Sequence, residues 1–265
     1  MIVCADDFGL AGDIDRAILD LAGRGRISAV SCMVALGHFD GVAFSTLRHL
    51  GDRLDVGLHL TLTDIPSVHD RSGVPSLLNS SGIFQSMGAL VRKGLWGGIH
   101  PADVARETRA QYDRFIQLAG RPPDYLDSHL HVHQFPGVRD GVLSFLEGLA
   151  PAARPYVRNS AMSFRKIIRQ GVSPAKCLVI GTYGRAFQKA LQTRGVRTNC
   201  GFAGIYAYDG HRAYPDYLAR FVDCMEGREG ILMTHPGEAE AWREIEYRTL
   251  LDAECLTGRV NRFNR

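Results

Sequence analysis

The sequence has no long apolar run, no paired cysteine motif and no basic tract. None of its apolar runs reaches the roughly 18 residues that a membrane-spanning helix needs. The amino terminus lacks the basic and apolar regions of a signal peptide. The six cysteines are scattered and include no CxxC pair, which is typical of reduced thiols in a cytoplasmic protein. The net charge is only +3, so neither nucleic acid nor an anionic membrane is implied as a partner.

Strand-like and helix-like segments alternate along the chain. β-rich or apolar runs occur at residues 1–5, 28–35, 55–63 and 124–132, near 156 and 198, and at 230–235. Helical patterns lie between them, at residues 10–24, 39–50, 101–120, 138–150, 187–194, 214–226 and 240–256. Repeated βα units predict an α/β protein with a parallel sheet. About seven or eight units suit one domain, residues 1–265, folded as a distorted (β/α) barrel of the TIM-barrel type. A doubly wound open sheet is the alternative.

Residues 64–100 interrupt this alternation. The segment is rich in Gly, Ser and Pro and is too long for an ordinary connection. We interpret it as a loop insertion over the barrel mouth, where it covers the active site and helps to select the substrate. Its apolar residues pack on the barrel, contact a substrate or meet a second subunit in a homodimer. Phe84 and Trp96 are the candidates for stacking on a sugar.

Acids and histidines follow several of the predicted strands at the point where each strand ends. These residues are Asp6, Asp7, His59, Asp127, His129 and His235. The carboxyl ends of barrel strands meet at one mouth, and the chemistry of such proteins is carried there. The sequence therefore predicts a polar site built from four separate strands.

The stretch "YLDSHLHVHQFP" places His129, His131 and His133 at alternate positions. In an extended strand these side chains share one face, but His129 and His133 would lie roughly 13 Å apart. A single ion with bonds of about 2.1 Å cannot reach both. At most two of the three histidines would then bind one metal, and the others bind substrate or are interior histidines with satisfied hydrogen bonds.

The other polar residues also have a structural interpretation. Asp6 and Asp7 could be a helix N-cap and a first-turn acid for the helix at 10–24, and His59 could be a core histidine. A shared mouth favours a functional role instead. One Asp with two His leaves coordination positions open on a divalent ion, as in catalytic sites. Such an ion lowers the pKa of a bound water and polarises a carbonyl, which is hydrolytic chemistry. A nearby carboxylate would then accept a proton, and a histidine would protonate the leaving group.

Four motifs, taken together, resemble the YdjC-type carbohydrate deacetylases. They are "ADDFG" at 5–9, "GLHLTLT" at 57–63, "LDSHLHVHQFP" at 126–136 and "THPG" at 234–237. They occur in the family's order and extend over nearly the whole chain. The family's histidine motif commonly reads "DSHHHVH", whereas this chain has Leu130 in the middle. We expect Leu130 to point away from the His129 face, without loss of metal binding.

The resemblance implies metal-dependent removal of acetyl from an N-acetylated sugar, such as a chitooligosaccharide or a hopanoid-type glycolipid. By match to the motifs, Asp7, His59 and His129 would bind one divalent ion. Asp6 would be the catalytic base and His235 the general acid. We expect Asp127 beside the metal ligands rather than among them, and His131 and His133 near the substrate.

The metal and the exact activity stay open at this point. Two imidazoles and a carboxylate favour zinc or another transition ion, while the family is often described with magnesium. The alternatives to a deacetylase are another barrel metallohydrolase, a sugar isomerase or a non-catalytic carbohydrate-sensing module. Asp6 and His235 argue against a sensing module, because binding alone requires neither base nor acid.

Overall fold

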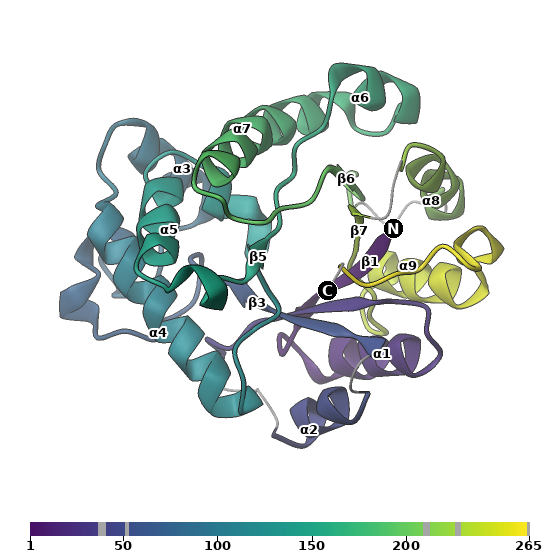
Figure 1. Ribbon diagram of the computed structural model, residues 1–265, viewed down its shortest axis with the longest axis horizontal. Helices are drawn as coiled ribbons and strands as arrows, with labels where there is room; N and C mark the ends of the chain where they lie inside the picture. Colours follow the sequence, from purple (N-terminus) through teal and green to yellow (C-terminus); the bar gives the residue numbers. More distant parts are fainter. Residues whose placement is uncertain (37–40, 51–52, 209–212, 226–228, 264–265) are drawn as a thin grey trace.

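The fold is a curved parallel sheet with helices around its outer side (Figure 1). The computed structural model describes residues 1–36, 41–50, 53–208, 213–225 and 229–263. The sheet has seven strands in the order β5-β4-β3-β2-β1-β7-β6. Its strands are β1 (Ile2–Phe8), β2 (Ala29–Cys32), β3 (Asp55–Leu60), β4 (Tyr125–Ser128), β5 (Tyr156–Val157), β6 (Gly201–Ala203) and β7 (Gly230–Thr234).

The strand order is that of a barrel, because neighbours in the sheet follow chain order all the way round, from β6 through β7 and β1 to β5. A doubly wound sheet would instead reverse direction at a switch point. An isolated parallel bridge joins Val157 of β5 to Thr198, three residues before β6. The α/β class is therefore confirmed as a curled half-barrel, and a complete TIM barrel is not confirmed.

The helices that surround the sheet agree with most of the predicted segments. They are α1 (Gly12–Gly23), α2 (Gly41–His49), α3 (Met87–Leu95), α4 (Pro101–Ala119), α5 (Val138–Glu147), α6 (Phe164–Gln170), α7 (Pro174–Thr193), α8 (Tyr214–Asp223) and α9 (Ala241–Asp252). Residues 39, 40 and 226, at the ends of two predicted helices, lie outside the described residues. No helix in the described ranges combines the length and apolarity that a membrane crossing requires.

Local sequence explains the best-predicted elements. All seven residues of β1 are buried, as expected for a strand covered on both faces. In α1, Ile14, Ile18 and Leu21 point into the core. In α4, Pro101 occupies the first turn and Gly120 ends the helix with φ 69°, a left-handed conformation that glycine adopts without a steric penalty.

The segment from 64 to 100 packs against the barrel through both apolar and polar contacts. Phe84 is fully buried in the main core. Two acids of α4 accept hydrogen bonds from its backbone: Glu107 from the amides of Val68 and His69 at 3.0 Å each, and Asp103 from that of Ser76 at 2.8 Å. The insertion is thus a fixed part of the scaffold. Packing on the barrel was one of the three roles expected for its apolar residues.

Three sequence-based assignments are wrong in detail. The strand predicted at 124–132 ends at Ser128, and His129–Gln134 forms a 3-10 turn. The strand expected near residue 198 begins at Gly201. The helix expected at 187–194 is the end of the longer α7, and α6 was not predicted. In this half of the chain, small and polar residues obscure the helical pattern.

Candidate active site

Asp7 reaches the site because the backbone of β1 turns at its carboxyl end. The pairing of β1 with β2 shifts register between Ala5 and Phe8, and Asp7 has φ 71°. A non-glycine residue in this region costs about 1 kcal/mol or more and is often found at functional sites. Asp7 and Asp6 are both almost fully buried, which excludes the interpretation of the pair as ordinary exposed helix-capping acids.

His59 is oriented by a carboxylate on the neighbouring strand. His59 of β3 pairs in register with Asp127 of β4, and its Nδ1–H donates to Asp127 Oδ1 at 2.6 Å. This bond fixes the ring so that Nε2 faces Asp7 Oδ1 at 3.4 Å. Asp127 thus lies behind the histidine, in the arrangement that carboxylates adopt towards metal-binding histidines.

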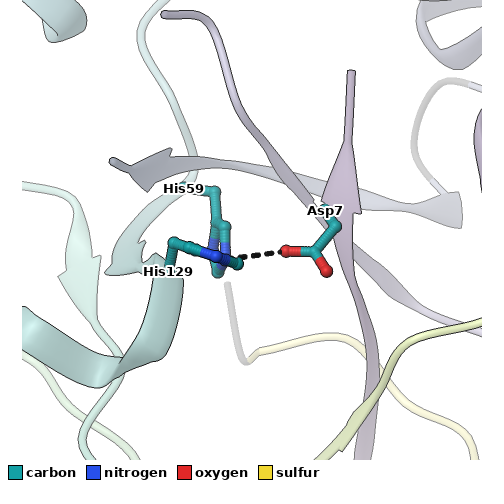
Figure 2. A group of neighbouring side chains, drawn as sticks. All are labelled: Asp7, His59 and His129. Carbon is teal, nitrogen blue, oxygen red and sulfur yellow. Dashed lines mark hydrogen bonds and ion pairs between the residues drawn. The ribbon is translucent and has the colours of Figure 1, made fainter. Parts of the chain in front are cut away.

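His129 completes a compact group of three ligand residues (Figure 2). Its Nδ1 lies 3.1 Å from the same oxygen, Asp7 Oδ1. One ligand atom from each of Asp7, His59 and His129 lies within 4.8 Å of the others. Donors bonded to one ion at about 2.1 Å are about 3.0 Å apart at right angles and about 3.4 Å apart in a tetrahedron. The residues therefore fit a divalent ion, and Arg243, which donates to Asp7 Oδ2 at 2.7 Å, leaves Oδ1 for that ion.

Asp6 is held by a buried arginine. Arg158, fully buried at the end of β5, donates to both carboxylate oxygens of Asp6 at 2.7 Å. Burial by itself would raise the pKa of Asp6, but the charge of Arg158 outweighs it and holds the pKa below its usual range. Asp6 is therefore an ionised carboxylate in a fixed orientation.

His235 follows β7 directly and faces Asp6 from the opposite side. Its Nε2 lies 4.0 Å from Asp6 Oδ2, and its Nδ1 lies 4.0 Å from Glu246 Oε1. Burial lowers the pKa of His235 to about 4, against the opposing effect of Asp7 and Asp6. Its Nδ1 is buried and has no hydrogen-bond partner among the described residues, so the ring has an unused polar atom aimed at Glu246.

Glu246 anchors this histidine from α9. It accepts a 2.6 Å hydrogen bond from the backbone amide of His235 and another of 2.6 Å from the hydroxyl of Tyr206. Burial raises the pKa of Glu246 to about 7. Protonated and ionised Glu246 are therefore both accessible near neutral pH.

The pocket at this site combines a polar floor with an apolar wall. Asp6, His59, His129, His131 and His235 contribute the polar groups. The other lining residues are Met87, Leu130, Lys176, Ile180, Ile205, Tyr208 and Met233. Leu130 thus lines the same pocket as His129, so the expectation that it points away from that face is wrong. Met87 is the contribution of the insertion.

His131 and His133 have different surroundings. The chain turns after Ser128 because Leu130 and His131 adopt φ of 55° and 57°, so the extended geometry assumed from the sequence does not apply. His133 donates from Nε2 to the carbonyl of Arg158 at 2.7 Å and contacts Ser128 Oγ through Nδ1. It is an interior histidine that holds the turn, which contradicts a direct role in substrate binding. His131 lines the pocket.

The two aromatic candidates of the insertion do not line this pocket. The ring of Phe84 is completely buried, so the expectation that it stacks on a sugar is wrong. Trp96 is 87% exposed at the end of α3, and it is not among the residues that line the pocket.

Sequence reasoning missed three residues of the site. Arg158 had a usable signal, since it follows the predicted strand near residue 156 as the other site residues follow theirs. Arg243 and Glu246 lie within the helix α9. Nothing in their local sequence distinguishes them from surface charges of that helix.

Fold and site together define a class: an α/β protein whose half-barrel sheet carries a metal-ligand group and an acid–histidine pair at its carboxyl ends. The family model described as YdjC-like protein matches residues 1–257. The chain belongs to this family, as its motifs predicted.

Relatives in sequence agree with this assignment, and solved structures share the fold. A mouse carbohydrate deacetylase is 33% identical over 248 residues, covering 89% of this chain and 77% of its own. A chitooligosaccharide deacetylase of Serratia marcescens is 29% identical over 191 residues, 72% of each chain. In structure, a candidate cellobiose-phosphate cleavage protein of Enterococcus faecalis matches 99% of this chain and 96% of its own, with a TM-score of 0.71 and 22% identity. A peptidoglycan N-acetylglucosamine deacetylase matches 99% and 84%, with a TM-score of 0.50 and 9% identity, and so shares the fold.

Proposed function

We propose that the protein is a metal-dependent deacetylase that hydrolyses the acetamido group of an N-acetylated sugar. The observation that carries the proposal is the placement of the Asp7, His59 and His129 group beside the Asp6–His235 pair. All of these residues except Asp7 line one pocket. The names of the relatives, carbohydrate deacetylase and chitooligosaccharide deacetylase, support the reaction and the substrate class.

Asp7, His59 and His129 would hold one divalent ion. When bound, such an ion activates water and polarises the amide carbonyl. The two imidazole nitrogens favour zinc or another transition ion over magnesium. Asp127 would keep the imidazole of His59 in the tautomer whose Nε2 is free to bind.

Asp6 would act as the base. Arg158 holds both of its oxygens and keeps it ionised, so the carboxylate can accept a proton from the attacking water at neutral pH. The same arginine prevents the side chain from turning towards the metal ligands. Its orientation is therefore fixed before substrate arrives.

His235 would act as the general acid. Its ring is neutral at pH 7 because burial lowers its pKa, so it would pass to the departing nitrogen of the sugar the proton that Asp6 accepts from the water. Its Nε2 lies 4.0 Å from Asp6 Oδ2, so base and acid lie next to each other and can both reach the reacting atoms of a bound amide. Glu246 lies on the Nδ1 side of the ring. It would stabilise the positively charged imidazole, in the way that a carboxylate supports the histidine of a catalytic triad. The apolar wall, with Leu130, Ile180 and Met233, would receive the acetyl methyl and the apolar face of the sugar.

The test is acetate release from N-acetylated mono- and oligosaccharides, with metal analysis of the purified protein. We expect acetate and a free amine in equal amounts, activity that is lost with a chelator, and recovery on adding back zinc. Gln188→Ala on α7, away from the pocket lining, is a suitable control variant. The absence of acetate release from every sugar in the panel by fully metal-loaded protein would contradict the proposal.

A further inference from the structure

One stretch of the chain has basic residues and no acidic ones, which the small net charge conceals. Residues 148–208 contain ten Lys and Arg and no Asp or Glu, whereas the rest of the chain contains 21 basic and 28 acidic residues. The net charge of the stretch is therefore +10, and that of the rest of the chain is −7. The stretch forms α6 and α7, which lie together at the upper rim in Figure 1.

The same two helices expose large apolar side chains. Phe164 and Ile168 of α6 are each 63% exposed, and Leu178 and Val179 of α7 are 43% and 55% exposed. Phe164 and Ile168 are one turn apart and therefore share a face of α6. Exposed apolar side chains grouped in this way usually mark an interaction surface.

Basic side chains lie between these apolar ones. Arg165, Lys166 and Arg169 line a shallow surface pocket on α6, and both arginines are exposed. A short apolar surface flanked by Lys and Arg is the composition of segments that bind at a membrane interface, where the apolar groups enter the headgroup region and the cations meet anionic lipids.

The start of α7 contributes both to this surface and to the active-site pocket. Lys176 and Ile180 of α7 line that pocket, and they neighbour Leu178 and Val179 in the sequence of the helix. Leu130, which lines the pocket from another element, is 39% exposed. Exposed apolar side chains therefore occur on α6, at the start of α7 and at the pocket itself.

We propose that α6 and the first turns of α7, the α6–α7 face, bind the surface of an anionic lipid membrane and hold the active-site pocket next to it. Two other occupants fit less well. A second copy meeting this face about a two-fold axis would bring Arg165 and Arg169 against their own copies. A nucleic acid would use the arginines but leave Phe164, Ile168 and Val179 without a partner.

Vesicle co-sedimentation tests this proposal independently of the enzymatic activity. The full chain is mixed with vesicles of phosphatidylglycerol and phosphatidylcholine in equal parts, or with vesicles of phosphatidylcholine alone. We expect binding to the anionic vesicles that weakens as salt is added, because screening reduces the attraction between exposed charges, and much weaker binding to the neutral ones.

Two double variants locate the binding surface. Arg165→Gln with Arg169→Gln is expected to weaken binding to anionic vesicles roughly 30-fold, from the usual contribution of each basic residue. Phe164→Ser with Ile168→Ser is expected to weaken it roughly tenfold through lost apolar burial. All four side chains are exposed, and thermal unfolding checks that each variant folds. Arg24→Gln, at the end of α1, with Arg248→Gln on α9 removes the same charge elsewhere on the surface, and this variant should bind as the parent does.

Several results would overturn the proposal. These are a parent protein that does not bind anionic vesicles, equal binding to neutral vesicles, unchanged binding in both α6 variants, or equal loss in the control. A dimer in sedimentation velocity that dissociates in the Phe164→Ser, Ile168→Ser variant would instead assign the α6–α7 face to self-association.

Discussion

Two groups of ligand-type side chains lie next to each other at the carboxyl ends of the strands, and they differ in what neutralises them. One consists of Asp7, His59 and His129, and the other of Cys4, Asp6 and Asp127. In the second group, the guanidinium of Arg158 lies 2.7 Å from Asp6, 2.9 Å from Asp127 and 3.5 Å from the Cys4 sulfur. A permanent cation already occupies it.

The comparison shows that two groups of similar residue types can differ in the positive charge that faces them. Asp127 contacts both groups, since one of its oxygens accepts a hydrogen bond from His59 of the first group and the other faces Arg158 in the second. In the second group, Arg158 orients Asp6 and Asp127. The histidines of the first group leave their free nitrogens around Asp7 Oδ1. Variants of the two groups and of their neighbours test this difference, from the largest expected effect to the smallest.

His129→Ala should abolish activity, because it removes one of three protein ligands from the first group. The side chain is partly exposed, so the free energy of unfolding of the metal-free protein should change little. Elemental analysis should find metal well below one equivalent. Full occupancy in this variant would show that the ion, if present, lies elsewhere.

Asp6→Asn should retain the metal and lose roughly 10²–10⁴-fold in turnover, the usual contribution of a general acid or base. His235→Ala should behave similarly, with a smaller loss on substrates whose leaving group needs no proton. Turnover measured beside metal content separates these variants from His129→Ala. Turnover at the parent rate in either variant would remove that residue from its proposed role.

Arg158→Met removes the cation from the second group and leaves two buried carboxylates facing each other. Breaking a buried ion pair on one side costs about 3–5 kcal/mol, which denaturant unfolding would measure. Arg158→Lys keeps the charge but not the paired hydrogen bonds, and it should recover part of the stability. Equal stability of the Met variant and the parent would show that the arginine is not needed to neutralise this group.

Glu246→Gln should lower turnover by roughly ten- to a hundredfold, the usual cost of losing the partner that orients a functional histidine. Burial raises the pKa of Glu246 from 4.5 to about 7, so the folded state holds its proton more tightly than the unfolded chain. Its stabilising contribution is therefore complete below pH 4.5 and is lost as pH rises through 7, by about 3 kcal/mol in total.

The difference in unfolding free energy between the parent and this variant, measured from pH 4 to pH 8, isolates Glu246 from the histidines that titrate in the same range. We expect that difference to shrink with rising pH. A constant difference would mean that Glu246 does not change its protonation on unfolding.

Cys4→Ala should have the smallest effect on function. If Arg158 fills the second group, the thiol has no part in metal binding, and metal content and activity should stay within about twofold of the parent. Loss of the buried thiol, which contacts Ser31 and Tyr125, should cost about 1 kcal/mol of stability. Loss of zinc in this variant would place the ion in the second group.

Much of the site could be predicted from the sequence, because most of its residues lie at the carboxyl ends of strands. Asp7, His59, Asp127 and His235 each end or follow a strand, and parallel strands bring their carboxyl ends to one edge. Their motifs also identified the family correctly. His129 was placed in the right group, although its strand ends one residue earlier and the chain turns there instead of continuing.

The assignments that were wrong depended on backbone conformation and packing. An alternating histidine pattern predicts a strand, but left-handed conformations at Leu130 and His131 cannot be recognised from residues that rarely adopt them. Phe84 is aromatic, as a residue that stacks on a sugar would be. It is nevertheless buried, because the insertion packs on α4 through Glu107 and Asp103.

The sequence by itself determined the class of fold, the family and the strand ends at which the polar residues lie, because periodicity and strand-end position are local properties. Only the tertiary structure decided which carboxylate meets which cation. The contacts of Arg158 with Asp6 and of Arg243 with Asp7 join residues 152 and 236 positions apart. They depend on the curvature of the sheet and on how α9 packs beside α1 and α8, which result from packing over the whole chain rather than from any local pattern.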